Sequence, residues 1–171
     1  IYTYTNFLSI SKLAVVTSFK KELSFIRYDI YGGNSVCERQ LIRFGSPEDY
    51  GYDAGYPITT LKISPLSVKF AEKLEHRDYL GALMNLGIER ELIGDIIIKD
   101  SDAYIFCISH IADYICDNLD TIRHTHIHCS VCEEDVPALK PELEDIRIIA
   151  ASPRIDAVVA SITKLSRSNS N

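Results

Sequence analysis

The chain has 171 residues, an apolar fraction of 46% and a formal net charge of −6. This length allows one large or two small domains, and the apolar fraction is typical of a globular protein with a real core, which argues against disorder. No apolar run approaches the roughly 18 residues that span a bilayer. Nothing near Ile1 resembles a secretion signal, so the five cysteines favour reduced thiols over a disulfide framework. We therefore expect a soluble, cytoplasmic protein.

Residues 1–52 predict a small N-terminal α+β unit. A short helical segment is expected within residues 1–23, followed by two strands, Phe25–Tyr31 and Val36–Phe44, that Gly32-Gly33-Asn34-Ser35 joins as a turn. The stretch Gly45–Pro57 holds three glycines and two prolines, which indicates a loop or linker. Three aromatic residues of this loop could stack on unpaired bases, but we expect them to pin the loop onto its own domain: Tyr50, Tyr52 and Tyr56.

Residues 53–135 predict a second domain in the order β-α-β-β-α-β. The expected elements are, in chain order, strand Ile58–Ile63, helix Glu75–Leu86, strands Ile93–Lys99 and Ala103–Ile108, a helix that Ser109 caps, and strand Thr121–Val131. This order matches the ferredoxin-like sandwich, also called split βαβ or α/β plait. In that fold, two helices cover one face of a four-stranded antiparallel sheet and leave the other face free. The predicted fold class is α+β.

The predicted sheet lacks the signature of an RNA-recognition motif. The third strand contains Tyr104 and Phe106 but not the Lys/Arg-Gly-aromatic context that accompanies base stacking in that motif. We therefore do not expect bases to stack on the sheet, and the fold alone does not give a function. Within the first helix, Gly81 is expected to let the helix lie close to the sheet.

Basic residues at the start of the first helix of this domain form a candidate RNA contact. His76 and Arg77 lie in its first turn, where free N–H groups and the positive end of the helix dipole attract a phosphate. The alternative is ordinary solvated charge, because Asp78 already complements the dipole and Arg77 can pair with Glu75 or Asp78. Arg90 is a third basic candidate on this domain.

Residues 136–150 predict a linker and a short strand, Ile146–Ala150, and residues 151–171 resemble the opening of an S4 RNA-binding domain. Arg154-Ile155-Asp156 matches the start of its first helix, and Ser166-Arg167 matches the start of its second. The resemblance implies RNA contacts from a helix cap and its basic neighbours, namely Arg154, Lys164, Ser166 and Arg167. The remaining elements of an S4 domain do not follow, so this S4 element is incomplete.

A gapless stretch of the central domain, Leu74–Ile97, resembles the YlmH family of bacterial S4-domain RNA-binding proteins. Shorter matches follow the family's order along the whole chain: Asn6-Phe7-Leu8-Ser9, Gly32-Gly33, Glu38-Arg39, Ala112-Asp113-Tyr114 and the S4 element. The resemblance implies an accessory factor, without catalytic activity or cofactor, that binds large-subunit ribosomal RNA and peptidyl-tRNA in the rescue of stalled ribosomes. The pair Asn169-Ser170 departs from the family, where a small apolar residue continues the helix.

Two features weaken the RNA-binding interpretation. A pI near 5.3 means that the chain is negatively charged at neutral pH, whereas a protein that holds phosphates over its whole surface needs a positive charge. In addition, genes of the YlmH family often lie beside cell-division genes. The alternative function is therefore a cell-division-associated factor that binds other proteins.

Enzymatic alternatives find little support. His76-Arg77-Asp78 spells the catalytic triplet of protein kinases, but the position of the required Asn is Leu83, and the chain has no glycine-rich phosphate loop or Asp-Phe-Gly. A cysteine nucleophile paired with His110 has no supporting motif. Three cysteines with apolar neighbours are expected to be small buried hydrophobic residues: Cys37, Cys107 and Cys116.

The run from His124 to Cys132 is a candidate metal site. His124, His126 and His128 alternate along a predicted strand, so all three would project from one face, and Cys129 and Cys132 form a C-x-x-C pair. The two cysteines, however, have opposite parity in a regular strand, and the histidines would have to bend the backbone to converge on one ion. We therefore predict a strand with a solvated polar face and no bound metal.

Overall fold

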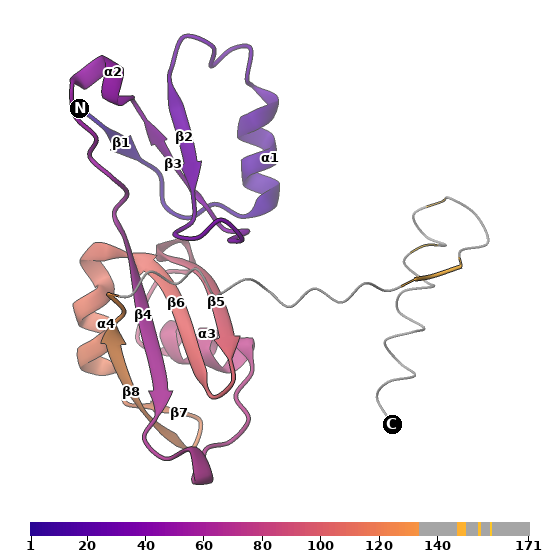
Figure 1. The fold of residues 1–171 in the computed structure, drawn as a ribbon, viewed down its shortest axis with the longest axis vertical. Coiled ribbons are helices and arrows are strands. Elements are labelled where there is room, and N and C mark those ends of the chain that lie inside the picture. Colours follow the sequence, from indigo (N-terminus) through magenta and orange to yellow (C-terminus); the bar gives the residue numbers. More distant parts are fainter. Residues whose placement is uncertain (134–146, 150–153, 155–157, 159–171) are drawn as a thin grey trace. The chain divides into compact units, whose positions relative to one another are not determined.

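The computed structural model describes residues 1–133, 147–149, 154 and 158. The chain divides into two compact units, Ile1–Lys140 and Pro141–Asn171, and each is considered by itself. The first unit contains a three-stranded and a five-stranded sheet, both antiparallel, together with helices (Figure 1). The predicted α+β class is therefore confirmed.

The N-terminal sheet has the strand order β1-β3-β2, formed by β1 (Thr3–Tyr4), β2 (Tyr28–Tyr31) and β3 (Leu41–Phe44). Helix α1 (Ile10–Ser18) begins after Ser9, whose hydroxyl accepts the N–H of Lys12 at 3.4 Å. The helix buries only Leu13. The α+β character of this unit is as predicted, although β1 was not expected.

The connection between β2 and β3 is longer than the four-residue turn predicted from the sequence. Residues 32–40 form a loop, because the backbone N–H groups of Glu38 and Arg39 donate to the Asp95 carboxylate and do not extend a strand. The predicted loop 45–57 also contains one helical turn, α2 (Pro47–Tyr50), which Ser46 caps. The predicted strands Phe25–Tyr31 and Val36–Phe44 are both longer than the observed β2 and β3.

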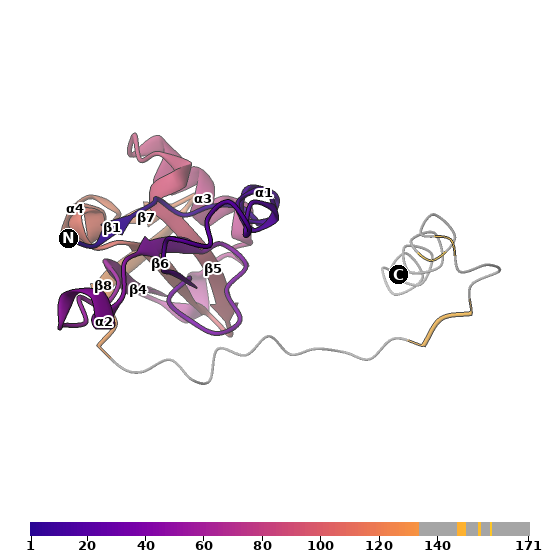
Figure 2. The same ribbon diagram turned by 90° about the horizontal axis from the view of Figure 1, so that it is seen from above.

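The central domain has the ferredoxin-like topology that the sequence predicted. Its elements are β4 (Ile58–Pro65), α3 (His76–Asn85), β5 (Ile93–Lys99), β6 (Asp102–Ile108), α4 (Ala112–Asn118), β7 (Thr121–Ile122) and β8 (Thr125–Val131). The sheet order is β5-β6-β4-β8-β7, and each pair of neighbours is antiparallel. Helices α3 and α4 lie on the same side of this sheet (Figure 2).

Two details of this domain differ from the prediction. Ser109 does not cap α4: it begins a 3-10 turn, and its hydroxyl lies 2.9 Å from the Thr59 hydroxyl. The predicted last strand is interrupted, because Arg123 adopts a left-handed conformation with φ 54° and turns the chain between β7 and β8. A non-glycine residue at this φ gives no turn signal in the sequence.

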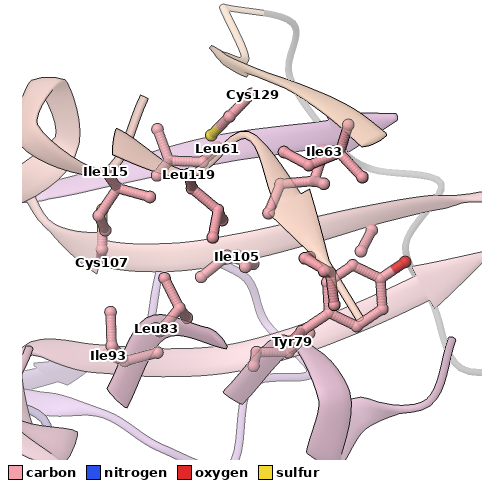
Figure 3. Packing of buried hydrophobic residues seen from close by; sticks show 14 of the residues in the cluster. Leu61, Ile63, Tyr79, Leu83, Ile93, Ile105, Cys107, Ile115, Leu119 and Cys129 are labelled. Carbon is pink, nitrogen blue, oxygen red and sulfur yellow. The ribbon is translucent and has the colours of Figure 1, made fainter. Parts of the chain in front are cut away.

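Apolar side chains fill the space between the sheet and the two helices. Leu61 and Ile105, from neighbouring strands, pack with Leu83 of α3 and Ile115 of α4, and all four are fully buried (Figure 3). This alternation of inward and outward residues on β4 and β6 is what the period-2 pattern of the sequence predicts. The helices bury their stripe of apolar residues against the same face.

The opposite face of the sheet was expected to be free, but part of it is covered. Phe106 and Ile108 of β6 pack in a second core with Phe7 and Leu41 of the N-terminal unit. At Gly94 an added Cβ would lie 2.8 Å from the Phe7 ring, so only glycine fits there. The N-terminal unit thus covers part of the face that a ferredoxin-like sandwich leaves open.

Outside residues 1–133, the structure gives little of the C-terminal region. Arg147, Ile148 and Ile149 have no regular secondary structure, so the strand predicted there is not observed in them. Among the helices that the structure describes, none is long and apolar enough to cross a bilayer.

Candidate nucleic-acid interface

Most of the S4 element lies outside the described residues. The N–H of Val158 donates to the carbonyl of Arg154 at 3.1 Å, and Val158 is helical, where the sequence predicted a helix. Lys164, Ser166 and Arg167 lie outside the described residues, so their RNA contacts remain predictions.

The start of α3 is organised by the Asp78 carboxylate. This carboxylate accepts the backbone N–H of Glu75 at 2.8 Å and pairs with Nε of Arg123 at 3.1 Å. Its side chain is only 8% exposed, so it is held firmly in place. His76 and Arg77 are exposed beside it, and Arg77 Nε pairs with Glu75 Oε2 at 3.1 Å. The pairing of Arg77 with Glu75, one of the predicted alternatives, is confirmed.

A hollow of about 530 Å³ lies beside α3, along most of the length of the helix. One wall is the α3 face that carries Arg77, Gly81 and Asn85. The other wall runs from the end of α4 through β7 to the turn at Arg123. The lining combines two arginines with two carboxylates, Asp78 and Asp120, and with amide and hydroxyl groups, which is a suitable set of donors and acceptors for a polar ligand.

Gly81 faces this hollow and not the sheet, contrary to the prediction. An added Cβ at Gly81 would meet no atom within 4 Å. The residues of α3 that approach the sheet are Tyr79 and Leu83, which are both buried. The close approach assigned to Gly81 is therefore wrong, and its Cα borders open space.

Sequence reasoning missed Arg123. Its guanidinium is half exposed and reaches α3 across the hollow to pair with Asp78. The residue lies inside a stretch that was predicted as an uninterrupted strand, and its turn contains no glycine or asparagine. The pairing of β7 with β8 creates the turn that carries Arg123, and Arg123 lines the same hollow as Arg77.

The structure does not bring Arg90 together with His76 and Arg77. Arg90 Nη1 donates to the carbonyls of Ile93 and Gly94 at 2.7 and 3.3 Å. Burial, followed by the neighbouring Arg39, lowers the pKa of Arg90 below its ordinary value. These bonds give Arg90 a structural role at the junction with the N-terminal unit, and an RNA contact from it remains a prediction.

The open part of the sheet carries a small polar cluster. Lys62 Nζ pairs with Asp102 Oδ2 at 3.0 Å and lies 5.9 Å from the centroid of the Tyr104 ring. Phe106, the other aromatic residue of this strand, is 1% exposed beneath the N-terminal unit. The covering of Phe106 is a physical reason why this sheet differs from a base-stacking platform.

The candidate metal ligands are not gathered in one place. His124 lies in the turn between β7 and β8, whereas His126 and His128 are exposed on β8 and Cys129 is buried beneath it. Among the described residues, no group of three or more His, Cys, Asp or Glu side chains is placed to hold a metal ion. The prediction that three histidines alternate along one strand is therefore wrong for His124.

The cysteine predictions are partly confirmed. Cys37 and Cys107 are buried, and burial raises the pKa of each thiol to about 12. Cys116 is partly exposed, and its sulfur lies 3.6 Å from that of Cys129.

The tyrosines of the loop 45–57 pack onto the N-terminal unit, as predicted. The rings of Tyr50 and Tyr52 contact Tyr2 with centroid distances of 5.0 and 5.3 Å. Tyr56 packs against Tyr31 at 5.1 Å. These contacts hold the loop against its own domain.

Comparison with known proteins places the ferredoxin-like domain in a family. The family model YlmH_RBD, described as "Putative RNA-binding domain in YlmH", matches residues 52–135. The "Ribosome-associated protein quality control protein P2" of Bacillus subtilis (strain 168) is 28% identical over 115 residues. The ferredoxin-like domain belongs to the YlmH family.

The extent of these matches differs. The match to the Bacillus subtilis protein covers 64% of this chain and 44% of that protein, so the chain spans less than half of its relative. The structure of "Cell division protein ylmH from Streptococcus pneumoniae" has a TM-score of 0.62 at 19% identity, and the match covers 77% of this chain and 78% of that one. This likeness shows that the YlmH fold is shared. The hollow beside α3 lies inside the matched RNA-binding domain.

Proposed function

We propose that this chain is a non-enzymatic, cytoplasmic RNA-binding protein that contacts large-subunit ribosomal RNA and peptidyl-tRNA and acts in the rescue of stalled ribosomes. The observation that carries the proposal is the match of the family's RNA-binding model to the ferredoxin-like domain. The name of the Bacillus subtilis relative, a ribosome-associated quality control protein, supports the ribosomal context. The proposal extends these general statements to a particular subunit and to tRNA.

The distribution of charge along the chain supports different roles in RNA binding for the S4 element and for the rest of the chain. Residues 151–171 contain three basic side chains and one acidic one, although the whole chain carries −6. Phosphate contacts are therefore concentrated in the S4 element, and the acidic remainder repels RNA except at local basic groups. In this proposal the S4 element supplies most of the affinity, and the N-terminal and ferredoxin-like domains orient it.

Co-sedimentation with purified large ribosomal subunits over a series of salt concentrations tests this function. Binding through phosphates releases counterions, so the affinity should fall steeply as salt rises. An affinity that is the same at low and high salt would contradict RNA binding as the basis of the association.

The alternative is a protein-interaction factor of cell division. It rests on the name of the similar Streptococcus pneumoniae structure, a cell division protein, and on the acidic charge of the chain. Contact through an apolar protein surface should barely respond to salt. The same salt series therefore separates the two functions.

The role of the S4 element has its own test. In a chain extended to a complete S4 domain, Arg154→Ala and Arg167→Ala should remove much of the RNA affinity, whereas Lys21→Ala, an exposed basic residue of the N-terminal unit, should not. The 171-residue chain should bind orders of magnitude more weakly than the extended chain. Equal affinity of the two chains would move the principal RNA-binding surface to the ferredoxin-like domain.

A further inference from the structure

The hollow beside α3 has the size of a small-ligand site. Its volume of about 530 Å³ falls within the range of roughly 300 to 1,000 Å³ that is usual for ligand pockets. Its two walls come from separate parts of the chain, α3 on one side and the segment from Asn118 to Arg123 on the other. The hollow is therefore a product of the tertiary fold and not of one helix end.

Gly81 keeps this hollow open. A glycine in the middle of a helix lowers helix stability relative to alanine, so it usually has a steric reason. At Gly81 there is none within the fold, because a Cβ would meet no atom within 4 Å and would project into the hollow. The space that Gly81 leaves is available to something other than this protein's own side chains.

Two arginines present their outer edges at one end of the hollow. Arg77 and Arg123 are each bonded through Nε, the first to Glu75 and the second to Asp78, both at 3.1 Å. Among the described residues, no bond is made by the terminal Nη groups of either side chain, and both side chains are at least half exposed. A guanidinium oriented in this way can still offer two parallel N–H donors to a phosphate.

The other lining groups suit a base and not a second phosphate. The far end of the hollow offers the amides of Asn85 and Asn118 and the hydroxyl of Thr121, with Leu86 and Leu119 as apolar surface. The two arginines pair with Glu75 and Asp78, and Asp120 adds a further carboxylate to the lining, so the local charge is too small for a nucleoside triphosphate. One phosphodiester with one unpaired base matches this balance of charge and hydrogen-bonding groups.

We propose that the hollow holds one unpaired nucleotide of the bound RNA, with a phosphate at the outer edges of Arg77 and Arg123 and the base between Asn85 and Asn118. This inference rests on the proposed RNA-binding function and specifies where the ferredoxin-like domain reads single-stranded RNA. It also assigns a role to Arg123, which sequence reasoning did not detect. Asp78 is a positioning residue, since it holds Arg123 and leaves only 8% of its own side chain exposed where it lines the hollow.

Filling the hollow provides the sharpest test, measured with the 171-residue chain and a short labelled single-stranded oligoribonucleotide of mixed sequence. Gly81→Gln places a long polar side chain in the hollow and should weaken binding about tenfold. Gly81→Ala gains the same helix propensity but leaves most of the space, so its affinity should stay near that of the native chain. Equal affinity of the two variants, both folded by circular dichroism, would overturn the inference.

The arginines supply a second readout. The double variant Arg77→Ala/Arg123→Ala should weaken binding and lower the slope of log affinity against log salt by about one for the lost phosphate contact. The matched control is Arg27→Ala, which removes an equally exposed arginine that pairs with Glu48 on the N-terminal unit. A slope that changes equally in both variants would show a general effect of charge and would also overturn the inference.

Failure of the inference and failure of the proposed function give different results. If the native chain binds the oligoribonucleotide and the hollow variants bind it equally well, only the assignment of the hollow is wrong. If a chain extended to a complete S4 domain binds neither this RNA nor large subunits at low salt, the RNA-binding function itself is wrong and the inference falls with it.

Discussion

The two sheets of residues 1–133 are stabilised in different ways. In the ferredoxin-like domain, both helices and all five strands contribute to one continuous apolar core. In the N-terminal unit, α1 contributes a single buried residue, Leu13, and a charged side chain, Arg43, lies in the interior. The ferredoxin-like domain therefore has an apolar core of its own that can stabilise it alone. The N-terminal unit depends instead on polar bonds, some of which reach the ferredoxin-like domain.

Arg43 is the centre of the N-terminal unit. Its guanidinium is bonded to Asp29 at 3.0 Å and to Asp53, and it lies over the rings of Tyr2 and Tyr56 at 5.2 and 4.7 Å. The hydrogen bond to Asp29, followed by that to Asp53, raises the pKa of Arg43 above its ordinary value. The charge is thus satisfied by carboxylates and aromatic faces in place of water.

Arg39 connects the two regions. Its Nε donates to the carbonyl of Ile93 at 3.0 Å, and its Nη2 donates to the carbonyls of Phe7 and Arg90, both at 3.2 Å. Phe7 also donates its backbone N–H to the carbonyl of Glu91 at 2.8 Å. Phe7 and Arg39 carried part of the family resemblance, and the structure gives both of them roles in joining the N-terminal unit to the ferredoxin-like domain.

The largest effect is expected from a cavity in the apolar core. Leu83→Ala should lower the free energy of unfolding by about 3 kcal/mol, because the fully buried side chain leaves a space that the sheet and helices cannot refill. Urea denaturation followed by circular dichroism measures the change. Leu66→Ala, at a position 69% exposed, is the control and should change stability by less than about 0.5 kcal/mol. Similar losses in both variants would contradict the assigned core.

Arg43→Ala should lower the free energy of unfolding by about 2 kcal/mol, since it removes a side chain that is only 7% exposed, together with its ion pairs and its packing on Tyr2 and Tyr56. The loss should be local. Hydrogen exchange should show reduced protection in β2 and β3 and unchanged protection in β4 and β6. The control, Arg27→Ala, removes an arginine that is 59% exposed and paired at the surface, which contributes little. Equal loss of protection in both sheets would mean that the two regions unfold as one.

The order of elements in the ferredoxin-like domain could be predicted because each element satisfies a local periodicity. The apolar residues of β4, α3 and β6 repeat with the spacing that their own secondary structure requires. The start of β3 was predicted less well, since residues 38 and 39 donate their N–H groups to Asp95, more than fifty positions away, and do not extend the strand. Such a bond has no local signal.

The candidate site shows the same division. His76 and Arg77 were found because helix starts attract anions and their sequence is local. Arg123 was missed because its place beside α3 depends on the turn between β7 and β8 and on the partly buried Asp78. Gly81 was misassigned, because the sequence shows a glycine in a helix but not which way its missing side chain would point.

Two buried thiols report separately on the two regions. Cys37 lies in the core shared with the N-terminal unit and Cys107 in the core of the ferredoxin-like domain. Burial, with a smaller contribution from Asp95, raises the pKa of Cys37 to about 12, and burial raises that of Cys107 to about 12. Near pH 8 only about one thiol in ten thousand is then ionised, so neither should react with iodoacetamide in the folded protein.

With increasing urea, Cys37 should be alkylated at a lower concentration than Cys107, as followed by peptide mass spectrometry, because the N-terminal unit opens first. The same thiols also make the free energy of unfolding depend on pH. An unfolded thiol ionises near its ordinary value of 9.0, while the folded thiols keep their protons, so stability should fall as the pH rises from about 9 towards 12. Simultaneous alkylation of both cysteines would contradict independent opening.

The smallest effect concerns two glycines, one inside the ferredoxin-like domain and one at its junction with the N-terminal unit. Gly81→Ala should raise the free energy of unfolding by about 0.5 to 1 kcal/mol, because alanine favours the helix and its Cβ meets no atom within 4 Å. Gly94→Ala should lower stability, because its Cβ would lie 2.8 Å from the ring of Phe7. Thermal unfolding of both variants measures the two signs. A loss of stability from Gly81→Ala would show that the surface beside α3 is closed in the folded protein, and it would remove the space on which the nucleotide site depends.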